Sequence, residues 1–455
     1  FNMQENKMGV MPVNKLLITM AVPMMLSMLV QALYNIVDSM YVAQISENAL
    51  TAVSLAFPFQ NLMISVGVGT GVGVNSLLSR LLGEKNSKEA SATAVNGMFL
   101  ALCGFIVFAV VGTLCVRPFF EFQTNIPEIV EGGVSYLSIC TLFSAGLFAA
   151  TMTEKLLAAT GKTVLTMYTQ MAGALTNIVL DPILIFGLLG FPAMGIAGAA
   201  VATVIGQIVS GLLGIWLNHS KNHEIQMHYR HFRPNFNLIH RIYSVGLPSI
   251  IMQSVGSVMT FGMNQILIPF TTTAAAVFGI YFKLQSFVFL PLFGMNNGMV
   301  PIVAYNYGAR KPERIRSVFK YALTYGLLLM TAGTLIFELA PGVLLKIFAA
   351  SDHMLAIGMP ALRIIALTFI PAAFGIVSSG VFQATGHGMF SLWQSLLRQL
   401  VMLLPCAWLF SFTGNLDLVW LAFPISEMVS CMFSAFCLKW IFKHQIQPME
   451  IQVNA

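Results

Sequence analysis

Charged residues are scarce in this chain of 455 residues, because only 9% of them are Asp, Glu, Lys or Arg. A soluble domain typically carries about 25% charge. The 23 basic and 17 acidic side chains are too few to solvate the surface of a 49.6 kDa globule. Hydrophobic residues make up 57% of the chain, and the mean hydropathy is +0.80. These values exclude soluble enzymes, disordered scaffolds and secreted disulfide frameworks, and they predict a polytopic membrane protein.

Motifs for nucleotide, metal and hydrolytic chemistry are also missing. The sequence has no GxxxxGK[ST] phosphate loop, so ATP is not expected to drive this chain, and it has no HExxH or GxSxG motif. The six cysteines lie in apolar stretches without a CxxC pair, and the four loop histidines, His219, His223, His228 and His231, have no Cys or acidic cluster beside them. We therefore expect no enzyme activity, no metal site and no cofactor, and no nucleic acid partner.

Apolar stretches long enough to cross a bilayer core of about 30 Å occur twelve times. The predicted spans are 15–43, 52–82, 92–116, 132–158, 163–188, 193–218, 240–269, 275–306, 318–340, 355–384, 391–412 and 418–441. A polar stretch separates two sets of six. The sequence therefore predicts an all-α polytopic membrane protein with an N-lobe over 1–218, a cytoplasmic linker over 219–238 and a C-lobe over 239–455.

Basic residues orient these spans. Seven Lys and Arg residues of the first half and twelve of the second fall on one side, among them Lys88, Lys162 and Arg310. The opposite loops carry mainly acidic residues such as Glu131 and Asp417. Positively charged loops stay in the cytoplasm. We therefore predict a multi-pass protein of the inner (plasma) membrane with both termini in the cytoplasm.

The two halves of the sequence repeat each other at one constant offset in the numbering, which we call the repeat spacing. The pairs that share this offset are Pro23 and Pro248, Gln60 and Gln285, Gly83 and Gly308, and the ATG turns at 159–161 and 384–386. Each half has an even number of spans, so both halves enter the membrane in the same direction. The repeats are then related by an axis along the membrane normal. Two such lobes can enclose a cavity that rocking exposes to alternate sides, which favours a transporter.

Two carboxylates lie at membrane depth in the first half, where an ionisable group is costly and marks function by default. Asp38 lies in the first span and Asp181 in the fifth. Residues four apart share a helix face, so Tyr34 accompanies Asp38 and Asn177 accompanies Asp181. Two structural alternatives remain: Asp38 as a satisfied carboxylate between helices, and Asp181 as a residue that serves the kink at the following proline.

Further polar residues are candidates for the two kinds of site. Thr203 and Gln207 lie four residues apart in the sixth span, so three helices of one lobe present polar stripes that could meet. The candidates for a substrate cavity are Asn35, Gln207, Asn264, Gln265 and Lys283.

Other charges within or near the spans have plainer explanations. Glu154 and Lys155, near the cytoplasmic end of the fourth span, predict a local salt link. Lys283 and Arg363 have long stems that favour an interfacial position. Glu427 could balance one of them, and the sequence does not decide between these options.

Several of these features resemble the multidrug and toxic compound extrusion (MATE) family over essentially the whole chain. They are the AVP opening at 21–23, the LYNIVD stretch at 33–38, the SRLLGEKN turn at 79–86 and the duplicated ATG turn. The grouping of the two aspartates with Asn177 is similar to the DinF-like branch, where the equivalent aspartates bind the coupling proton or sodium ion. The resemblance implies a coupling-ion site made of Tyr34, Asp38, Asn177, Asp181 and Thr203. The second-lobe acids of the NorM-like branch are absent.

The sequence and the resemblance together predict an ion-coupled secondary antiporter. We expect it to exchange H⁺ or Na⁺ for lipophilic or cationic drugs and toxic small molecules by alternating access, as a monomer in the lipid bilayer. One alternative is a flippase of the wider superfamily that moves lipid-linked oligosaccharides or lipids, and another is an intramembrane enzyme. A flippase needs cationic residues for a diphosphate, whereas the first lobe presents acids.

Overall fold

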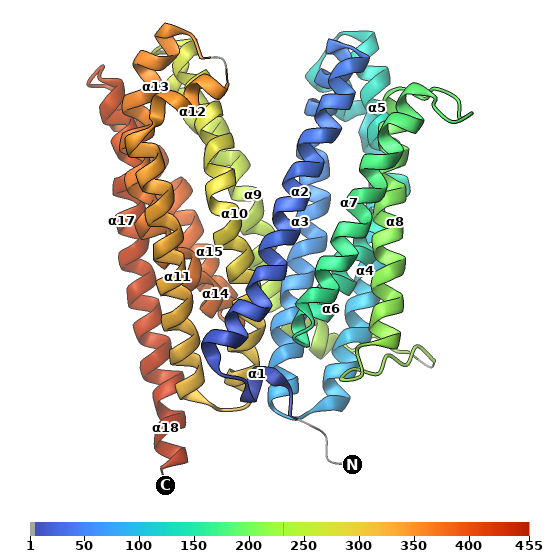
Figure 1. The fold of residues 1–455 in the computed structure, drawn as a ribbon, viewed down its shortest axis with the longest axis vertical. Coiled ribbons are helices and arrows are strands. Elements are labelled where there is room, and N and C mark those ends of the chain that lie inside the picture. Colours follow the sequence, from blue (N-terminus) through green and yellow to red (C-terminus); the bar gives the residue numbers. More distant parts are fainter. Residues whose placement is uncertain (1–4, 231, 349, 455) are drawn as a thin grey trace. The chain divides into compact units, whose positions relative to one another are not determined.

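The computed structural model describes residues 5–230, 232–348 and 350–454, and the regular elements within these ranges are all helical (Figure 1). His231 of the loop histidines lies outside the described residues. The helices of the first half are α1 (Lys7–Val10), α2 (Val13–Ile45), α3 (Glu47–Gly83), α4 (Ser87–Gln123), α5 (Pro127–Leu142), α6 (Ala145–Ala159), α7 (Thr163–Phe186) and α8 (Ile196–Ser220). The second half has α9 (Phe236–Leu267), α10 (Thr272–Gly308), α11 (Pro312–Leu339), α12 (Pro341–Ile347), α13 (Asp352–Ile365), η1 (Ala366–Thr368), α14 (Phe369–Ala384), α15 (Gly388–Leu396), η2 (Leu397–Val401), α16 (Leu403–Ser411), α17 (Leu416–Ile441), η3 (Phe442–Ile446) and α18 (Gln447–Val453).

The helices agree with the predicted spans. Ten helices in the described ranges are long and apolar enough to cross a membrane, and the pair α5 and α6, bent by 49° at its break, makes an eleventh span. The remaining predicted span, 391–412, consists of α15, the π-helical turn η2 and α16, and each of these pieces is too short to span a membrane alone. The prediction of an all-α fold with twelve spans is confirmed.

The chain folds into two compact bundles whose boundaries fall inside helices. The N-bundle contains residues 26–250, and the C-bundle contains residues 1–25 and 251–455. The helices α2 and α9 thus each give their first part to one bundle and the remainder to the other. The two changeover points, after positions 25 and 250, are separated by the repeat spacing of the sequence. Each one follows a proline inside the helix, Pro23 in α2 and Pro248 in α9.

Glycines of α3 decide where the first part of α9 packs in the N-bundle. A Cβ atom on Gly69 would lie 2.9 Å from the backbone nitrogen of Ile250 and 3.1 Å from the carbonyl oxygen of Gly246. A Cβ atom on Gly73 would overlap the backbone carbonyl of Ile242. Only glycine permits this backbone-to-backbone approach between helices. The glycine-rich string at 67–73 is therefore a packing surface and not a nucleotide loop.

The C-bundle repeats this arrangement with the first part of α2. A Cβ atom on Gly294 of α10 would lie 2.7 Å from the Cα atom of Met25, and a Cβ atom on Gly298 would lie 2.8 Å from the Cα atom of Ala21. These two glycines are the counterparts of Gly69 and Gly73 at the repeat spacing. The sequence repeat is thus a structural repeat, in which each half lends the start of its first helix to the bundle of the other half.

Local backbone features follow the same spacing. Gly161 and Gly386, in the two ATG turns, have φ values of 91° and 85°, a region that glycine adopts without a steric penalty. The side chain of Ser46 caps α3 and that of Thr271 caps α10, each accepting a backbone hydrogen bond of 3.0 Å from the residue three positions later. The duplicated sequence therefore specifies the same helix starts and turns in both halves.

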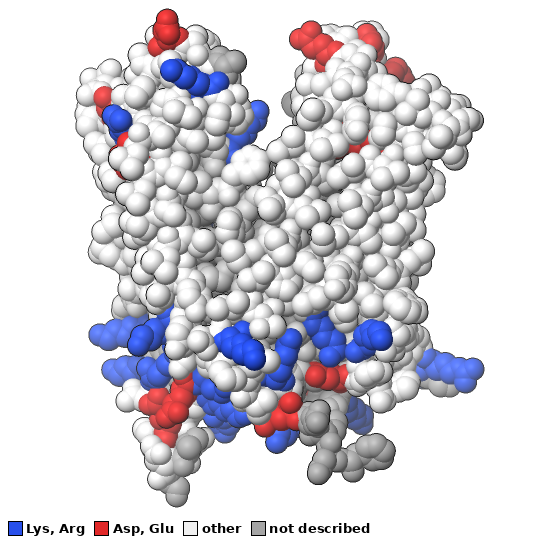
Figure 2. Space-filling model, viewed as in Figure 1, with Lys and Arg blue, Asp and Glu red and all other residues white. Residues whose placement is uncertain are grey.

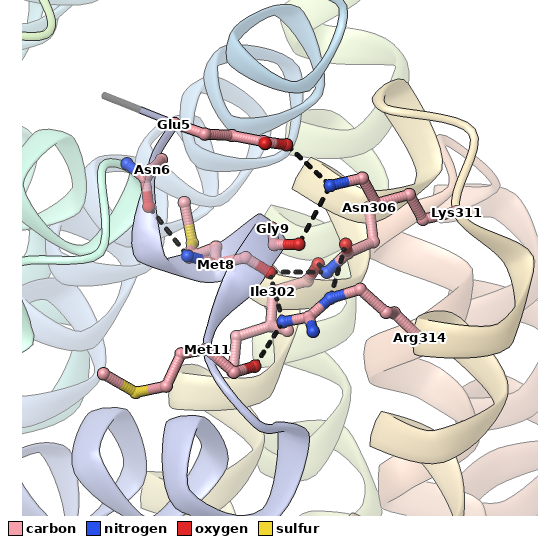
Figure 3. Close-up of polar contacts among 9 residues, drawn as sticks. All are labelled: Glu5, Asn6, Met8, Gly9, Met11, Ile302, Asn306, Lys311 and Arg314. Atoms are coloured by element: carbon pink, nitrogen blue, oxygen red, sulfur yellow. Dashed lines mark hydrogen bonds and ion pairs between the residues drawn. The ribbon is translucent and has the colours of Figure 1, made fainter. Parts of the chain in front are cut away.

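The segment before α2 is fixed to the C-bundle by side chains at the α10–α11 turn (Figure 3). Asn306 donates from Nδ2 to the carbonyl oxygen of Met8 at 2.9 Å. Arg314 donates from Nη2 to the carbonyl oxygens of Met8 at 3.0 Å and Met11 at 2.8 Å. Lys311 donates from Nζ to the carbonyl oxygen of Gly9 at 2.9 Å. These contacts satisfy backbone acceptors that a short helix leaves open, and they hold the start of α2 in the C-bundle.

Charged side chains are segregated along each bundle. Figure 2 shows a band of Lys and Arg side chains near one end of each bundle, with some Asp and Glu side chains beside it, whereas Asp and Glu side chains lie at the tip of the opposite end, with a few Lys and Arg side chains close by. In the C-bundle, α1 and α18 lie at the basic end (Figure 1). The surface between the two ends is almost free of charge on the face shown, which suits contact with lipid.

Candidate functional site

Three helices of the N-bundle bring the predicted coupling-ion residues together. The part of α2 that belongs to this bundle carries Tyr34 and Asp38 one turn apart, α7 carries Asn177 and Asp181, and α8 carries Thr203. Asn177, Asp181 and Thr203 are buried, whereas Tyr34 and Asp38 are partly exposed. The residues predicted for the coupling-ion site therefore form a single cluster in the structure.

The Asn177 amide connects the members of this cluster. Its orientation with the nitrogen toward Asp181 satisfies both ends of the amide, so we adopt it. The nitrogen then donates to the two carboxyl oxygens of Asp181 at 3.1 and 3.2 Å, and the oxygen accepts from the Tyr34 hydroxyl at 2.8 Å and the Thr203 hydroxyl at 3.2 Å. A single amide thus links residues of α2, α7 and α8.

The two carboxyl groups of the cluster are neighbours that interact with each other. The side chains of Asp38 and Asp181 lie close enough to interact, so the two carboxyl groups can share a proton. A carboxylate has no proton to donate, so a hydrogen bond between two carboxyl groups requires that one of them is protonated. Oδ1 of Asp38 is buried and accepts no hydrogen bond from any described residue. The pair can therefore hold one proton, and it presents a further oxygen for a ligand.

The cluster offers only oxygen atoms as possible cation ligands. These are the two carboxyl groups, the Asn177 carbonyl and the hydroxyls of Tyr34 and Thr203. Hard cations prefer oxygen ligands, and two neighbouring carboxyl groups also bind a proton readily because like charges cannot both remain ionised at low cost. The chemistry of this donor set fits a proton or a sodium ion.

The backbones of α7 and α8 approach closely beside the cluster. A Cβ atom on Gly206 of α8 would lie 2.7 Å from the carbonyl oxygen of Gly173 in α7 and 3.2 Å from the Cβ atom of Asn177. Glycine at both positions allows the contact. This packing sets Asn177 opposite Thr203, which the sequence spacing alone could not specify.

The predicted substrate-cavity residues do not form one cluster in either bundle. In the N-bundle, Asn35 of α2 is exposed and Gln207 of α8 is partly exposed. In the C-bundle, Asn264 of α9 is partly exposed, whereas Gln265 of α9 and Lys283 of α10 are exposed. Nζ of Lys283 lies 5.9 Å from the ring centroid of Phe348, a cation–π contact. Their role as cavity residues remains a prediction.

Glu154 lies in a second polar cluster, which differs from the predicted salt link with Lys155. Its carboxylate accepts hydrogen bonds from Ser210 Oγ of α8 at 3.1 Å and from Gln170 Nε2 of α7 at 3.1 Å. Lys155 is not among its hydrogen-bond or ion-pair partners in the described part of the chain. The prediction was wrong because adjacent residues on a helix point in different directions. The sequence feature that could have indicated this cluster is the group of polar residues at the start of the fifth span.

Glu427 and Arg398 form an ion pair in the C-bundle that the sequence did not predict. Arg398 lies in the π-helical turn η2, and its Nε atom is 3.9 Å from Oε2 of buried Glu427 in α17. Arg363, in contrast, donates to the backbone oxygen of Glu338 at 3.2 Å. The charge of Glu427 is therefore balanced by Arg398 of the same bundle, and not by Lys283 or Arg363.

Comparison with known proteins agrees with this architecture. A family model described as MatE matches residues 23–183 and 248–409, and the starts of these two segments are separated by the repeat spacing. The chain is 25% identical to "Multidrug export protein MepA" of Staphylococcus haemolyticus, over 95% of this chain and 94% of that protein. It is 23% identical to "FAD transporter" of Shewanella oneidensis, over 93% of this chain and 94% of that protein.

Solved structures give the same result. One, described as the outward-facing conformation of a multidrug resistance MATE family transporter of the MOP superfamily, matches with a TM-score of 0.91 and 25% identity, covering 99% of both chains. Another, a MOP superfamily transporter from Pyrococcus furiosus described as having a binding pocket of reversed polarity, matches with a TM-score of 0.90 and 25% identity, covering 99% of both chains. With the MatE model matching most of the chain and relatives covering nearly all of it, this protein belongs to the MATE family of multidrug and toxic compound extrusion transporters.

Proposed function

We propose that this transporter is an ion-coupled antiporter that exports lipophilic or cationic small molecules in exchange for protons, or for sodium ions. The observation that carries the proposal is the oxygen-lined cluster on three helices, in which Asn177 links Asp181 to Tyr34 and Thr203 and the neighbouring Asp38 presents a buried oxygen that has no partner among the described residues. A membrane-embedded carboxyl pair is expensive to maintain and suits an ion-binding role. Transport itself follows from the family, and the coupling ion and the exchange mechanism are our proposal.

The exchange follows from competition for negative charge in the N-bundle. When a proton or sodium ion binds at Asp38 and Asp181, it neutralises charge that would otherwise attract a cationic substrate. Binding also changes the hydrogen bonds that Asp181 makes with Asn177, and through this amide those of Tyr34 and Thr203. An ion shifts a conformational equilibrium only by its differential affinity for the two states. The cluster supplies such a difference, because its hydrogen bonds depend on whether the ion is bound.

The printed names of the relatives leave more than one substrate class open. Two of them are multidrug export proteins by name, whereas another is a FAD transporter. The acidic cluster favours a cationic substrate for the protein described here, and it argues against a flippase for lipid-linked diphosphates. We propose that the chain performs this exchange as a monomer and without any enzymatic step.

Ethidium export is the direct test of this function. Expression in an efflux-deficient host should raise ethidium resistance severalfold and lower intracellular ethidium. Dissipating the proton gradient, or the sodium gradient if sodium is the coupling ion, should abolish the effect because the energy comes from the ion. Dye accumulation in the presence and absence of a protonophore is the measurement. Unchanged resistance with normal membrane insertion would contradict the proposal, as would export that persists after both gradients are removed.

We also propose that the protein lies in the inner membrane with both termini in the cytoplasm. The helix α4 has 37 residues, so its ends lie about 55 Å apart, well beyond the bilayer core of about 30 Å. Lys88 lies in its first turn, and Glu131 follows its far end. Single cysteines at position 88 should be protected from an impermeant thiol reagent in intact cells, whereas those at position 131 should react. Labelling of both positions from the same side would contradict the topology.

A further inference from the structure

A second carboxyl group between helices of the N-bundle has no assigned role. Glu154 of α6 accepts hydrogen bonds at its side chain from Ser210 of α8 and Gln170 of α7, each at 3.1 Å. The Thr169 hydroxyl lies 3.4 Å from Oε1 of Glu154, and it donates at 2.7 Å to the carbonyl oxygen of Thr166. Three helices thus meet around one carboxyl group inside the spanning region.

The partners of Glu154 can serve both protonation states of the carboxyl group. The hydroxyls of Ser210 and Thr169 can donate or accept, and the amide of Gln170 has both a donor and an acceptor end. The cluster therefore remains hydrogen-bonded when Glu154 gains a proton and becomes a donor. Glu427 of the C-bundle differs, because the guanidinium group of its partner Arg398 only donates and favours the carboxylate.

The internal repeat shows that the fold does not require an acid at this position. Ser379 in α14 is the counterpart of Glu154 at the repeat spacing and lies at the equivalent position of its own helix. Thr166 Oγ1 donates to the carbonyl oxygen of Glu154 at 3.1 Å, and its own counterpart, Ser391, donates from Oγ to the carbonyl oxygen of Ser379 at 3.0 Å. The C-bundle therefore builds the equivalent helix contact with a serine. Packing alone gives no reason to retain a costly carboxyl group in the N-bundle.

Glu154 is connected to the proposed coupling site by the helices that build both. On α7, Thr169 precedes Asn177 by two turns, about 12 Å along the helix axis. On α8, Ser210 follows Thr203 by about two turns. The Gly173–Gly206 contact between the two helices lies between the clusters. A change in the packing of α7 on α8 at one cluster can therefore act on the other through this contact.

The position of Glu154 places its proton exchange on the cytoplasmic side of the coupling site. It lies five residues before the end of α6, and the turn that follows carries Lys162, which we predict to be cytoplasmic. The charged group that acts on Glu154 is Lys155 of the same helix. The side chains that face it from α7 and α8, namely Thr169, Gln170 and Ser210, do not titrate in the physiological range. Glu154 is partly exposed.

We infer that Glu154 is a second proton-binding carboxyl group of the N-bundle, which exchanges its proton with the cytoplasm when the Asp38–Asp181 pair releases the coupling ion. The inference rests on the proposed antiport and identifies its ion as the proton. A carboxyl group on the exit side gives the released proton a membrane-embedded acceptor. In this arrangement Glu154 is needed for net proton-driven export, but not for exchange of one substrate molecule for another.

Everted membrane vesicles test this inference with the full-length protein. Glu154→Gln keeps the size of the side chain and, like the protonated acid, has one donor end and one acceptor end, but it cannot release a proton. We expect it to lose proton-driven ethidium accumulation, while the exchange of labelled for unlabelled ethidium without a gradient stays near the wild-type rate. Glu154→Asp should restore part of the accumulation. Ser210→Ala, which removes a donor but keeps the acid, should retain accumulation with a shifted dependence on the pH of the cytoplasmic face.

Two results with the variants would overturn the inference. The first is accumulation of ethidium by Glu154→Gln at the wild-type rate. The second is loss of both accumulation and exchange by a normally inserted Glu154→Gln protein, which would indicate a structural role. The wild-type protein separates this inference from the proposed function. If a sodium gradient alone drives its accumulation, the role of Glu154 is wrong and the antiport stands. If no ion gradient drives it, both are wrong.

Discussion

Replacing Asp38 by asparagine should reduce ethidium export to the background of the host without loss of folded, inserted protein. Asparagine has nearly the shape of the protonated aspartate but cannot release a proton or carry negative charge. The Asp38–Asp181 pair then no longer distinguishes the ion-bound from the ion-free state. Because an ion acts only through such differential affinity, coupled export stops. Ethidium accumulation in cells, normalised to the amount of protein in the membrane, is the measurement.

Exposed acids provide the matched control for this experiment. Glu47, in the first turn of α3, is exposed, and Glu47→Gln removes one negative charge from the same bundle. This variant should export ethidium as the wild type does. Asp181→Asn should also impair export, but to a degree that depends on the kink at Pro182. Export by Asp38→Asn at the wild-type rate under a proton gradient would show that the coupling site lies elsewhere.

Gly298→Leu should lower the stability of the C-bundle. Gly298 of α10 faces the backbone of α2, where a Cβ atom would already lie within 2.8 Å of Ala21 Cα and 2.9 Å of its nitrogen. A leucine side chain forces the two helices apart, and overpacking of this kind costs about 3 kcal/mol or more when backbone atoms must move. We expect a thermal midpoint lower by several degrees and less protein in the membrane.

Gly279 of the same helix is the control for this variant. A Cβ atom at Gly279 would meet no other atom within 4 Å, and the residue is exposed. Gly279→Leu should leave the thermal midpoint and the export rate close to those of the wild type, although both substitutions add the same side chain to α10. Equal behaviour of the two variants would mean that the contact between α2 and α10 does not stabilise the C-bundle.

The sequence by itself determined the class of protein, the number of spans and the internal repeat. These features are local: a span is a run of about 20 apolar residues, and a repeat is a constant spacing. The same holds for the ATG turns, where glycine must adopt positive φ, and for the stripes that put Tyr34 with Asp38 and Asn177 with Asp181. The helical periodicity of about 3.6 residues per turn is sufficient to predict which residues share a face of a helix.

Only the tertiary structure decided which faces meet. The first parts of α2 and α9 each pack in the bundle of the other half, and glycines of α3 and α10 make this packing possible. These glycines are distant in the chain from the backbone atoms that they contact. The apolar content of the spans therefore does not reveal the arrangement. The sequence pairs Glu154 with its neighbour Lys155, whereas its hydrogen-bond partners come from α7 and α8. Side chains of different helices are brought together by packing, and the free energy of burying a carboxyl group depends on those distant neighbours rather than on the adjacent residue.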